Sequence, residues 1–187
     1  MPFTRPAFRR LAYLGRALLL CLGVAALPLH AADDASVARR LDAVSQVVLG
    51  ILSYARWPRE QNPLNLCLVG PTEYADGLLR LEQPPGDGQR IQVQRRAADD
   101  AGLGEQCQAV YLGVLSDSER QRVFAGLSGH AVLSIDEQDR QCSVGSMFCL
   151  DIRADQVSFA VNLDSVARSG VRVHPRVLDL ARRRGGA

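Results

Sequence analysis

The segment Ala109–Leu115, with the sequence AVYLGVL, is a nearly continuous run of apolar residues. A short run that is apolar at consecutive positions predicts a strand buried on both faces, as in the interior of a parallel sheet. The segments 64–69 (LNLCLV) and 131–135 (AVLSI) predict two more strands, and the alternating segment 90–95 (RIQVQR) predicts a fourth. We therefore expect a sheet built around residues 109–115.

Helical patterns separate these strands. Residues 36–55 carry apolar side chains at helical spacing, with Ser36 as N-cap and Trp57-Pro58 as the stop. Shorter helices are predicted over 72–82, 117–127, 162–169 and 175–184, with Thr72, Ser116 or Asp117, Asn162 and Pro175 at their starts. Residues 97–106 predict a weak helix or a loop, and residues 171–174 predict an extended segment.

In the last third of the chain, two predicted strands follow each other without a helix between them. Residues 147–152 and 157–161 predict a hairpin that turns near 153–156. Because strands alternate with helices before this hairpin, the pattern predicts a single three-layer α/β domain. In this fold, helices flank a mostly parallel sheet with an antiparallel edge.

The N-terminus has the organisation of a secretory signal. Residues 1–16 are basic, residues 17–27 (ALLLCLGVAAL) are apolar, and small residues follow at Ala31 and Ala32. The apolar stretch is short for a membrane span, which needs about 20 residues, although an uncleaved anchor is the alternative. We therefore expect a signal peptide over 1–32, cleavage near Ala31/Ala32 and an exported domain over 33–187.

The charge balance excludes some classes of function. The chain has 22 basic residues, all of them Arg, and 20 acidic residues. Four arginines and no acid precede Asp33, so the exported part is slightly negative overall. This argues against a dedicated nucleic-acid binder, which needs a net basic footprint. The absence of Lys also excludes a lysine Schiff base and a Walker lysine.

Four cysteines follow the signal peptide, and an even number in an exported chain predicts two disulfides. Cys142 and Cys149 flank Gly145, so a local bridge is the simplest of three connectivities, and Cys67 then pairs with Cys107. Loop closure predicts about 4 kcal/mol from the long loop and about 2.5 kcal/mol from the short one. A zinc site is disfavoured because no Cys-x-x-Cys occurs. A redox-active short bridge is the other alternative.

The chain offers few groups for catalysis. Only His130 and His174 follow the signal peptide, and no Gly-x-Ser-x-Gly motif or glycine-rich phosphate loop occurs. Asp136, Glu137 and Asp139 lack the spacing of an EF-hand loop, which favours a solvated loop over a cation site. The sequence therefore predicts a protein that is not an enzyme and that uses no metal or other cofactor.

Residues 163–178 favour a binding surface. Leu163 and Val166 share a helix face, and Val173 and Pro175 share a strand face. With Leu178, they predict either core packing or a partly open apolar pocket that suits an aromatic anchor of a partner. Nearby basic residues predict either a site for an anionic ligand or a solvated patch; they are Arg168, Arg172 and Arg176.

Several segments, taken in order, resemble the YfiR family of periplasmic regulators. The leading helix ends in SYARWP (53–58), where Arg56 stands near a position that is often acidic in that family. The other matching segments are LNLCLVG (64–70), CQAVYL (107–112), VLSI (132–135) with Gly145 downstream, VSFAVNL (157–163), and a last helix with Leu178, Leu180 and Ala181. Their order, together with both cysteine pairs, carries the resemblance over essentially the whole exported chain.

The resemblance implies a periplasmic repressor that binds a YfiN-like inner-membrane diguanylate cyclase, lowers cyclic-di-GMP and restrains exopolysaccharide and biofilm formation. It also implies a homodimer, the disulfides Cys67–Cys107 and Cys142–Cys149, and sequestration by a YfiB-like outer-membrane lipoprotein. The partner-binding residues would be Leu163, Val166, Val173, Pro175, Leu178, Arg56, His174 and Phe148. The alternatives are a small-ligand sensor that uses Arg168, Arg172 and Arg176 with His174, and a hydrolase.

Overall fold

The computed structural model describes residues 29–80, 89–143, 145–153 and 156–185. Its contacts divide the chain into two units, Met1–Asp34 and Ala35–Ala187. The first unit is described only from residue 29, where helix α2 (Leu29–Ser53) begins, so most of the predicted signal peptide lies outside the described residues. Within the described part of the chain, no helix is both long enough and apolar enough to cross a membrane.

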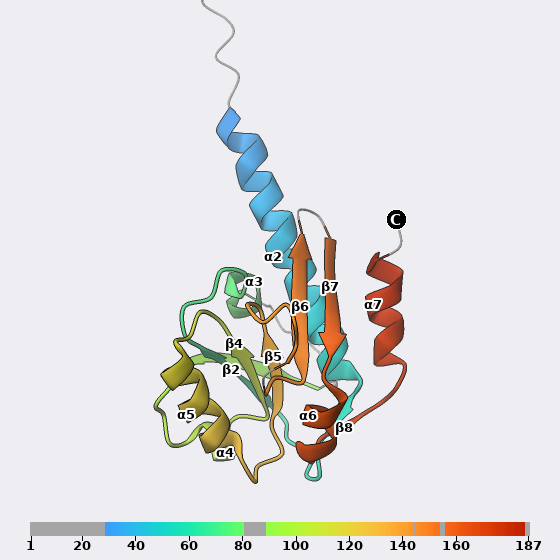
Figure 1. Ribbon diagram of the computed structural model, residues 1–187. Helices are drawn as coiled ribbons and strands as arrows, with labels where there is room; N and C mark the ends of the chain where they lie inside the picture. The colour runs from blue at the N-terminus through green and yellow to red at the C-terminus, as the bar shows by residue number, and fades with distance from the viewer. Residues whose placement is uncertain (1–28, 81–88, 144, 154–155, 186–187) are drawn as a thin grey trace, which may run out of the picture. The chain divides into compact units, whose positions relative to one another are not determined.

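Six strands form one sheet in the order β3-β2-β4-β5-β6-β7 (Figure 1). Neighbouring strands run parallel, except that β7 is antiparallel to β6. When the parallel strands of this sheet, β2 to β6, are renumbered 1 to 5 in chain order, they lie in the order 2-1-3-4-5, as in doubly wound sheets. This confirms the mostly parallel sheet with an antiparallel edge. The strands are β2 (Leu64–Val69), β3 (Ile91–Arg96), β4 (Ala109–Leu112), β5 (Leu133–Asp136), β6 (Phe148–Arg153) and β7 (Gln156–Val161).

Helices cover both faces of the sheet, which confirms the mixed α/β fold with its three layers. Because successive strand residues point to opposite faces, Leu66 packs into a core with α2, whereas Cys67 packs into a second core. The second core includes Leu103 of α4 (Leu103–Gln106) and Val123 of α5 (Asp117–Leu127). Figure 1 shows α4 and α5 on the opposite side of the sheet from α2.

Helix α2 fills the first core because its apolar residues recur at helical spacing. Val44, Val48 and Ile51 are fully buried. The last helix, α7 (Val177–Gly185), packs against α2 where Gly50 has no side chain. A β-carbon on Gly50 would lie 2.9 Å from Cδ1 of Leu180, so a larger residue would require the Leu180 side chain to shift.

Two very short strands form a separate antiparallel sheet, β1 (Ala55–Arg56) with β8 (Arg172–Val173). The extended segment predicted at 171–174 contains β8. The predicted helix over 36–55 ends earlier, at Ser53, because Ala55 and Arg56 pair with β8 instead.

Side-chain caps explain two of the shorter helices. Ser116 accepts a hydrogen bond from the Glu119 backbone, and the Glu119 side chain accepts one in return from the Ser116 backbone, which forms a capping box on α5. Asn162 caps α6 (Leu163–Arg168) by accepting from the Ser165 backbone N–H. The sequence predicted Asn162 at the start of its helix, and Ser116 as one of two candidates with Asp117.

A helix was predicted over 72–82, but most of the described residues in this range, 72–80, are not helical. Only α3 (Asp76–Leu79) forms, and its N-cap is Ala75 without a side-chain hydrogen bond. The backbone N–H groups of Glu73 and Tyr74 donate instead to the carboxylate of Glu137, at 2.7 and 3.2 Å. This side chain holds the chain in a turn where Thr72 was expected to begin a helix, and residues 81–82 lie outside the described part.

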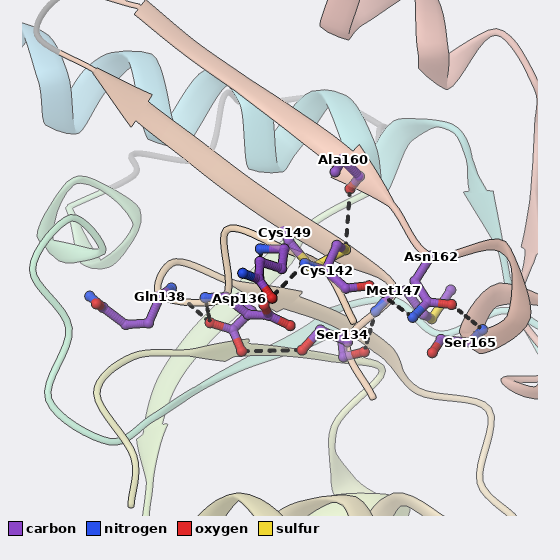
Figure 2. Close-up of a disulfide and its surroundings, with 12 residues drawn as sticks. Ser134, Asp136, Gln138, Cys142, Met147, Cys149, Ala160, Asn162 and Ser165 are labelled. Atoms are coloured by element: carbon purple, nitrogen blue, oxygen red, sulfur yellow. Dashed lines mark hydrogen bonds between the residues drawn. A yellow bond between two sulfur atoms is a disulfide. The ribbon is translucent and has the colours of Figure 1, made fainter. Parts of the chain in front are cut away.

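Both predicted disulfides are present. The Cα atoms are 5.9 Å apart in Cys67–Cys107 and 5.4 Å apart in Cys142–Cys149, within the usual range. The first bridge ties β2 to the end of α4 inside the second core. The second bridge ties β6 to the loop that precedes it, beside the carboxylate of Asp136 (Figure 2).

Candidate functional site

A pocket at the β1–β8 pair brings together six of the predicted site residues. Its volume is about 570 Å³. Arg56, Val173, His174 and Pro175 come from the predicted partner-binding set, and Arg172 and Arg176 come from the predicted ligand-binding set. We call this site the β1–β8 pocket; its lining is Ser53, Tyr54, Arg56, Arg172, Val173, His174, Pro175 and Arg176.

Backbone pairing fixes the shape of the β1–β8 pocket. Ala55 lies opposite Val173, and Arg56 lies opposite Arg172, which places two guanidinium groups on neighbouring strands. The pairing continues through the backbone N–H of His174, which donates to the carbonyl of Tyr54 at 2.9 Å. Segments more than a hundred residues apart in sequence therefore form one continuous wall.

The residues after β8 complete the pocket. The backbone N–H of Arg176 donates to Nδ1 of His174 at 3.2 Å, so the imidazole supports the turn into α7. The ring of His174 also lies near the ring of Tyr54, with centroids 6.3 Å apart. His174 thus has a structural role at the pocket.

The pocket is strongly basic. Nη1 of Arg56 donates to the carbonyls of Ser53 and Ala55, at 2.8 and 2.7 Å. Among the described residues, no carboxylate forms an ion pair with Arg56, Arg172 or Arg176. Unpaired cations beside the apolar groups of Val173 and Pro175 can bind a group that is partly apolar and partly anionic.

The other predicted binding residues lie outside the lining of this pocket. Leu163 and Leu178 are exposed, at 71% and 41%, while Val166 is half-buried against the first core. Arg168 is exposed near the end of α6. Phe148 is fully buried and packs edge-on against Phe159, with centroids 5.7 Å apart, so it has no surface to offer a partner.

The two adjacent acidic residues at the end of β5 are buried, so the predicted solvated loop is wrong at this point. Asp136 and Glu137 are only 0% and 6% exposed. Glu137 accepts from Oη of Tyr111 at 2.7 Å, in addition to the two backbone N–H groups described above. Burial raises the pKa of Glu137, and burial together with the Glu137 carboxylate raises the pKa of Tyr111.

The buried carboxylate of Asp136, like that of Glu137, has several hydrogen-bonding partners. It pairs with Arg120 of α5 and accepts from Oγ of Ser146 at 3.2 Å. It also accepts from the backbone N–H of Gln138 at 2.7 Å (Figure 2). The side chain therefore joins α5, β5 and the loop closed by the second disulfide. The polar segment DEQDR (136–140) gave no sign that its first two acids point inward.

These acids also close the crevice where doubly wound sheets bind small ligands, at the carboxyl ends of the strands. Glu137 occupies backbone donors that an anionic ligand would otherwise use. The loops after β2 and β4 are joined by hydrogen bonds from Gly113 to Val69, at 3.0 Å, and from Val114 to Pro71, at 2.7 Å. The described residues also contain no group of His, Cys, Asp and Glu able to hold a metal ion.

A smaller cavity of about 340 Å³ remains at this edge, beside β3. Two of its arginines are already paired: Arg95 contacts Asp76 at 3.1 Å, and Arg96 contacts Asp100 at 3.0 Å. The β1–β8 pocket, whose arginines have no such partners in the described structure, is therefore the stronger candidate for binding.

A comparison with protein families agrees with this emphasis on binding. Residues 42–182 match the family model described as YfiR/HmsC-like. That family is regulatory rather than catalytic and acts in the periplasm on the diguanylate cyclase system, and two disulfides fit an oxidising compartment. Since the match covers more than half of the chain, the protein belongs to the YfiR/HmsC-like family.

Proposed function

We propose that the protein represses an inner-membrane diguanylate cyclase by binding its periplasmic sensor part through the β1–β8 pocket. The observation that carries this proposal is the set of three arginines, unpaired among the described residues, beside an apolar wall. Such a surface favours a protein anchor over a buried small substrate because it combines charge with shallow apolar contact.

Repression requires unequal affinity for two states of the cyclase. A protein that bound the active and inactive states equally would shift nothing. The repressor therefore binds the inactive state more tightly, which lowers cyclic-di-GMP and with it exopolysaccharide and biofilm. A YfiB-like outer-membrane lipoprotein relieves repression by competing for the repressor, and the repressor acts as a homodimer.

The test is a measurement of cyclic-di-GMP in a strain that carries the cyclase. We expect deletion of the gene to raise cyclic-di-GMP, and the wild-type gene to restore the low level. The charge-reversed variant Arg172→Glu should fail to restore it, whereas Arg122→Glu on α5 should succeed. Unchanged cyclic-di-GMP after deletion would reject the repressor function.

The same pocket supports a second candidate function, a sensor of a small anionic ligand. Its volume lies within the usual range for small-molecule sites, and Arg172 and Arg176 supply positive charge. Thermal-shift screening of the purified protein with nucleotides and amino acids tests this function. We expect no shift if the pocket serves a protein partner only, and a shift that Arg172→Gln abolishes if it serves a ligand.

A further inference from the structure

A second cavity, of about 660 Å³, adjoins the β1–β8 pocket. Ser53 and Arg56 line both cavities, so the two spaces meet at the turn between α2 and β1. Leu52, Ala55 and Leu64 form an apolar floor in the second cavity, and all three are buried. We call this space the Trp57 cavity, because Trp57 also lines it.

The boundary between the two cavities is fixed by hydrogen bonds. Arg56 is held by the two carbonyl groups already described, and Nε1 of Trp57 donates to the carbonyl of Gln108 at 2.8 Å. The indole therefore spans from β1 to the start of β4. A surface held in this way is already formed before a partner arrives, which lowers the entropy that binding must overcome.

Cationic side chains outnumber carboxylates in the combined lining of the two cavities. Their lining contains the cationic side chains Arg56, Arg172 and Arg176, and its one carboxylate is that of Glu60. Glu60 is exposed and forms no ion pair with a described residue. The positive charge is therefore concentrated in the β1–β8 pocket and at Arg56, which both cavities share, and apolar side chains line each cavity.

We propose that the β1–β8 pocket and the Trp57 cavity form one groove that receives an extended acidic segment of the cyclase's periplasmic part. One apolar side chain of that segment enters each cavity, and a carboxylate between the two anchors meets Arg56. This inference rests on the proposed function and adds to it the form and chemistry of the bound segment. An extended segment fits because a single anchor fills one cavity and leaves its neighbour empty.

Photocrosslinking in living cells tests the groove. p-Benzoylphenylalanine replaces Gln61, which lines the Trp57 cavity, or Arg176, which lines the β1–β8 pocket. A third position, the exposed Ser118 on α5, serves as the control because it lies on the other face of the sheet. We expect positions 61 and 176 to crosslink to the cyclase, and position 118 to give no adduct.

The other outcomes separate the inference from the proposed function. A crosslink from position 176 alone rejects the groove and leaves the repressor function intact. A crosslink from position 61 only to a second copy of this chain rejects the groove as a site for the cyclase. If neither position 61 nor position 176 crosslinks to the cyclase in a strain where gene deletion raises cyclic-di-GMP, the groove is rejected and the repressor function stands.

A second measurement uses the full exported chain and the purified periplasmic part of the cyclase. Gln61→Trp should fill the Trp57 cavity and weaken binding by about tenfold or more, whereas Ser118→Trp should leave it unchanged. Added salt should weaken binding by the wild type, and this effect should shrink in Arg172→Gln. Equal affinity of Gln61→Trp and the wild type, or binding without salt dependence, overturns the inference.

Discussion

Arginines lie at two places in this domain, the carboxyl ends of the sheet strands and the β1–β8 pocket, and their ion pairing differs between the two. At the carboxyl ends of the strands they pair with carboxylates, in Arg95–Asp76, Arg96–Asp100 and Arg120–Asp136. In the β1–β8 pocket, Arg56, Arg172 and Arg176 have no carboxylate partner among the described residues. At the first edge, the carboxyl ends of the strands, most arginines are paired within the fold, with Arg122 as the exception, whereas all three arginines of the second edge, the β1–β8 pocket, lack a carboxylate partner in the described structure.

The comparison teaches that position in a fold does not decide where binding occurs. Doubly wound sheets commonly bind ligands at the carboxyl edge, yet here that edge is closed by Glu137 and by backbone hydrogen bonds between loops. A buried carboxylate that accepts several hydrogen bonds stabilises its neighbours and is costly to disturb. We therefore expect changes at the closed edge to affect folding, and changes at the pocket to affect binding.

The largest effect is expected at the disulfide inside the second core, Cys67–Cys107. Cys67→Ser should lower the free energy of unfolding by about 4 kcal/mol, against about 2.5 kcal/mol for Cys142→Ser, because the first bridge closes the longer loop. Urea denaturation of the two variants measures the difference, and periplasmic abundance should follow it. Equal losses would show that loop length does not set the contribution of these bridges.

Removal of one buried ionic partner should have the next largest effect. Arg120→Ala should cost about 3 kcal/mol or more, because it leaves Asp136 charged and fully buried. Arg122→Ala is the matched control on the same helix, because Arg122 forms no ion pair with a described residue. The control should change stability by less than about 0.5 kcal/mol. Similar costs for both variants would contradict the role of Asp136 as a structural link.

A smaller, pH-dependent effect is expected at Glu137, whose pKa is raised by burial above its ordinary value of 4.5. The folded protein then holds this proton at a pH where the unfolded chain has released it, so stability falls as pH rises through that interval. Glu137→Gln cannot titrate, and its stability disadvantage relative to wild type should shrink as pH rises from 4.5. Chemical denaturation across this range checks the sign, and a widening disadvantage would contradict it.

Much of the fold follows from local sequence patterns. The strand bounds at 64–69 and the cap at Asn162 depend on residues close together in the chain, so periodicity and capping chemistry found them. Capping chemistry narrowed the start of α5 to Ser116 or Asp117, and the structure shows Ser116. Cysteine spacing likewise gave both disulfides. The long helix was found too, but it begins at Leu29, so Ser36 lies inside it and is not its N-cap. Its end at Ser53 depends on β8, more than a hundred residues away.

The candidate site was only partly predictable, for the same reason. His174 and Pro175 were found from the apolar spacing of residues 163–178 and a family resemblance. No local pattern shows that Tyr54 completes their pocket, since this needs the β1–β8 pairing. Nor does composition show that Glu137 turns inward, because its partners are backbone groups of a distant loop.

The smallest effect on stability is expected in the pocket itself. Arg176→Gln should change the free energy of unfolding by less than about 0.5 kcal/mol, because its exposed guanidinium has no ion pair with a described residue to lose. At the closed edge, Arg96→Gln should cost up to about 1 kcal/mol, since Arg96 contacts Asp100. Only Arg176→Gln should weaken binding to the cyclase. A larger stability loss for Arg176→Gln than for Arg96→Gln would mean that the pocket arginines serve the fold, and the contrast between the two edges would fail.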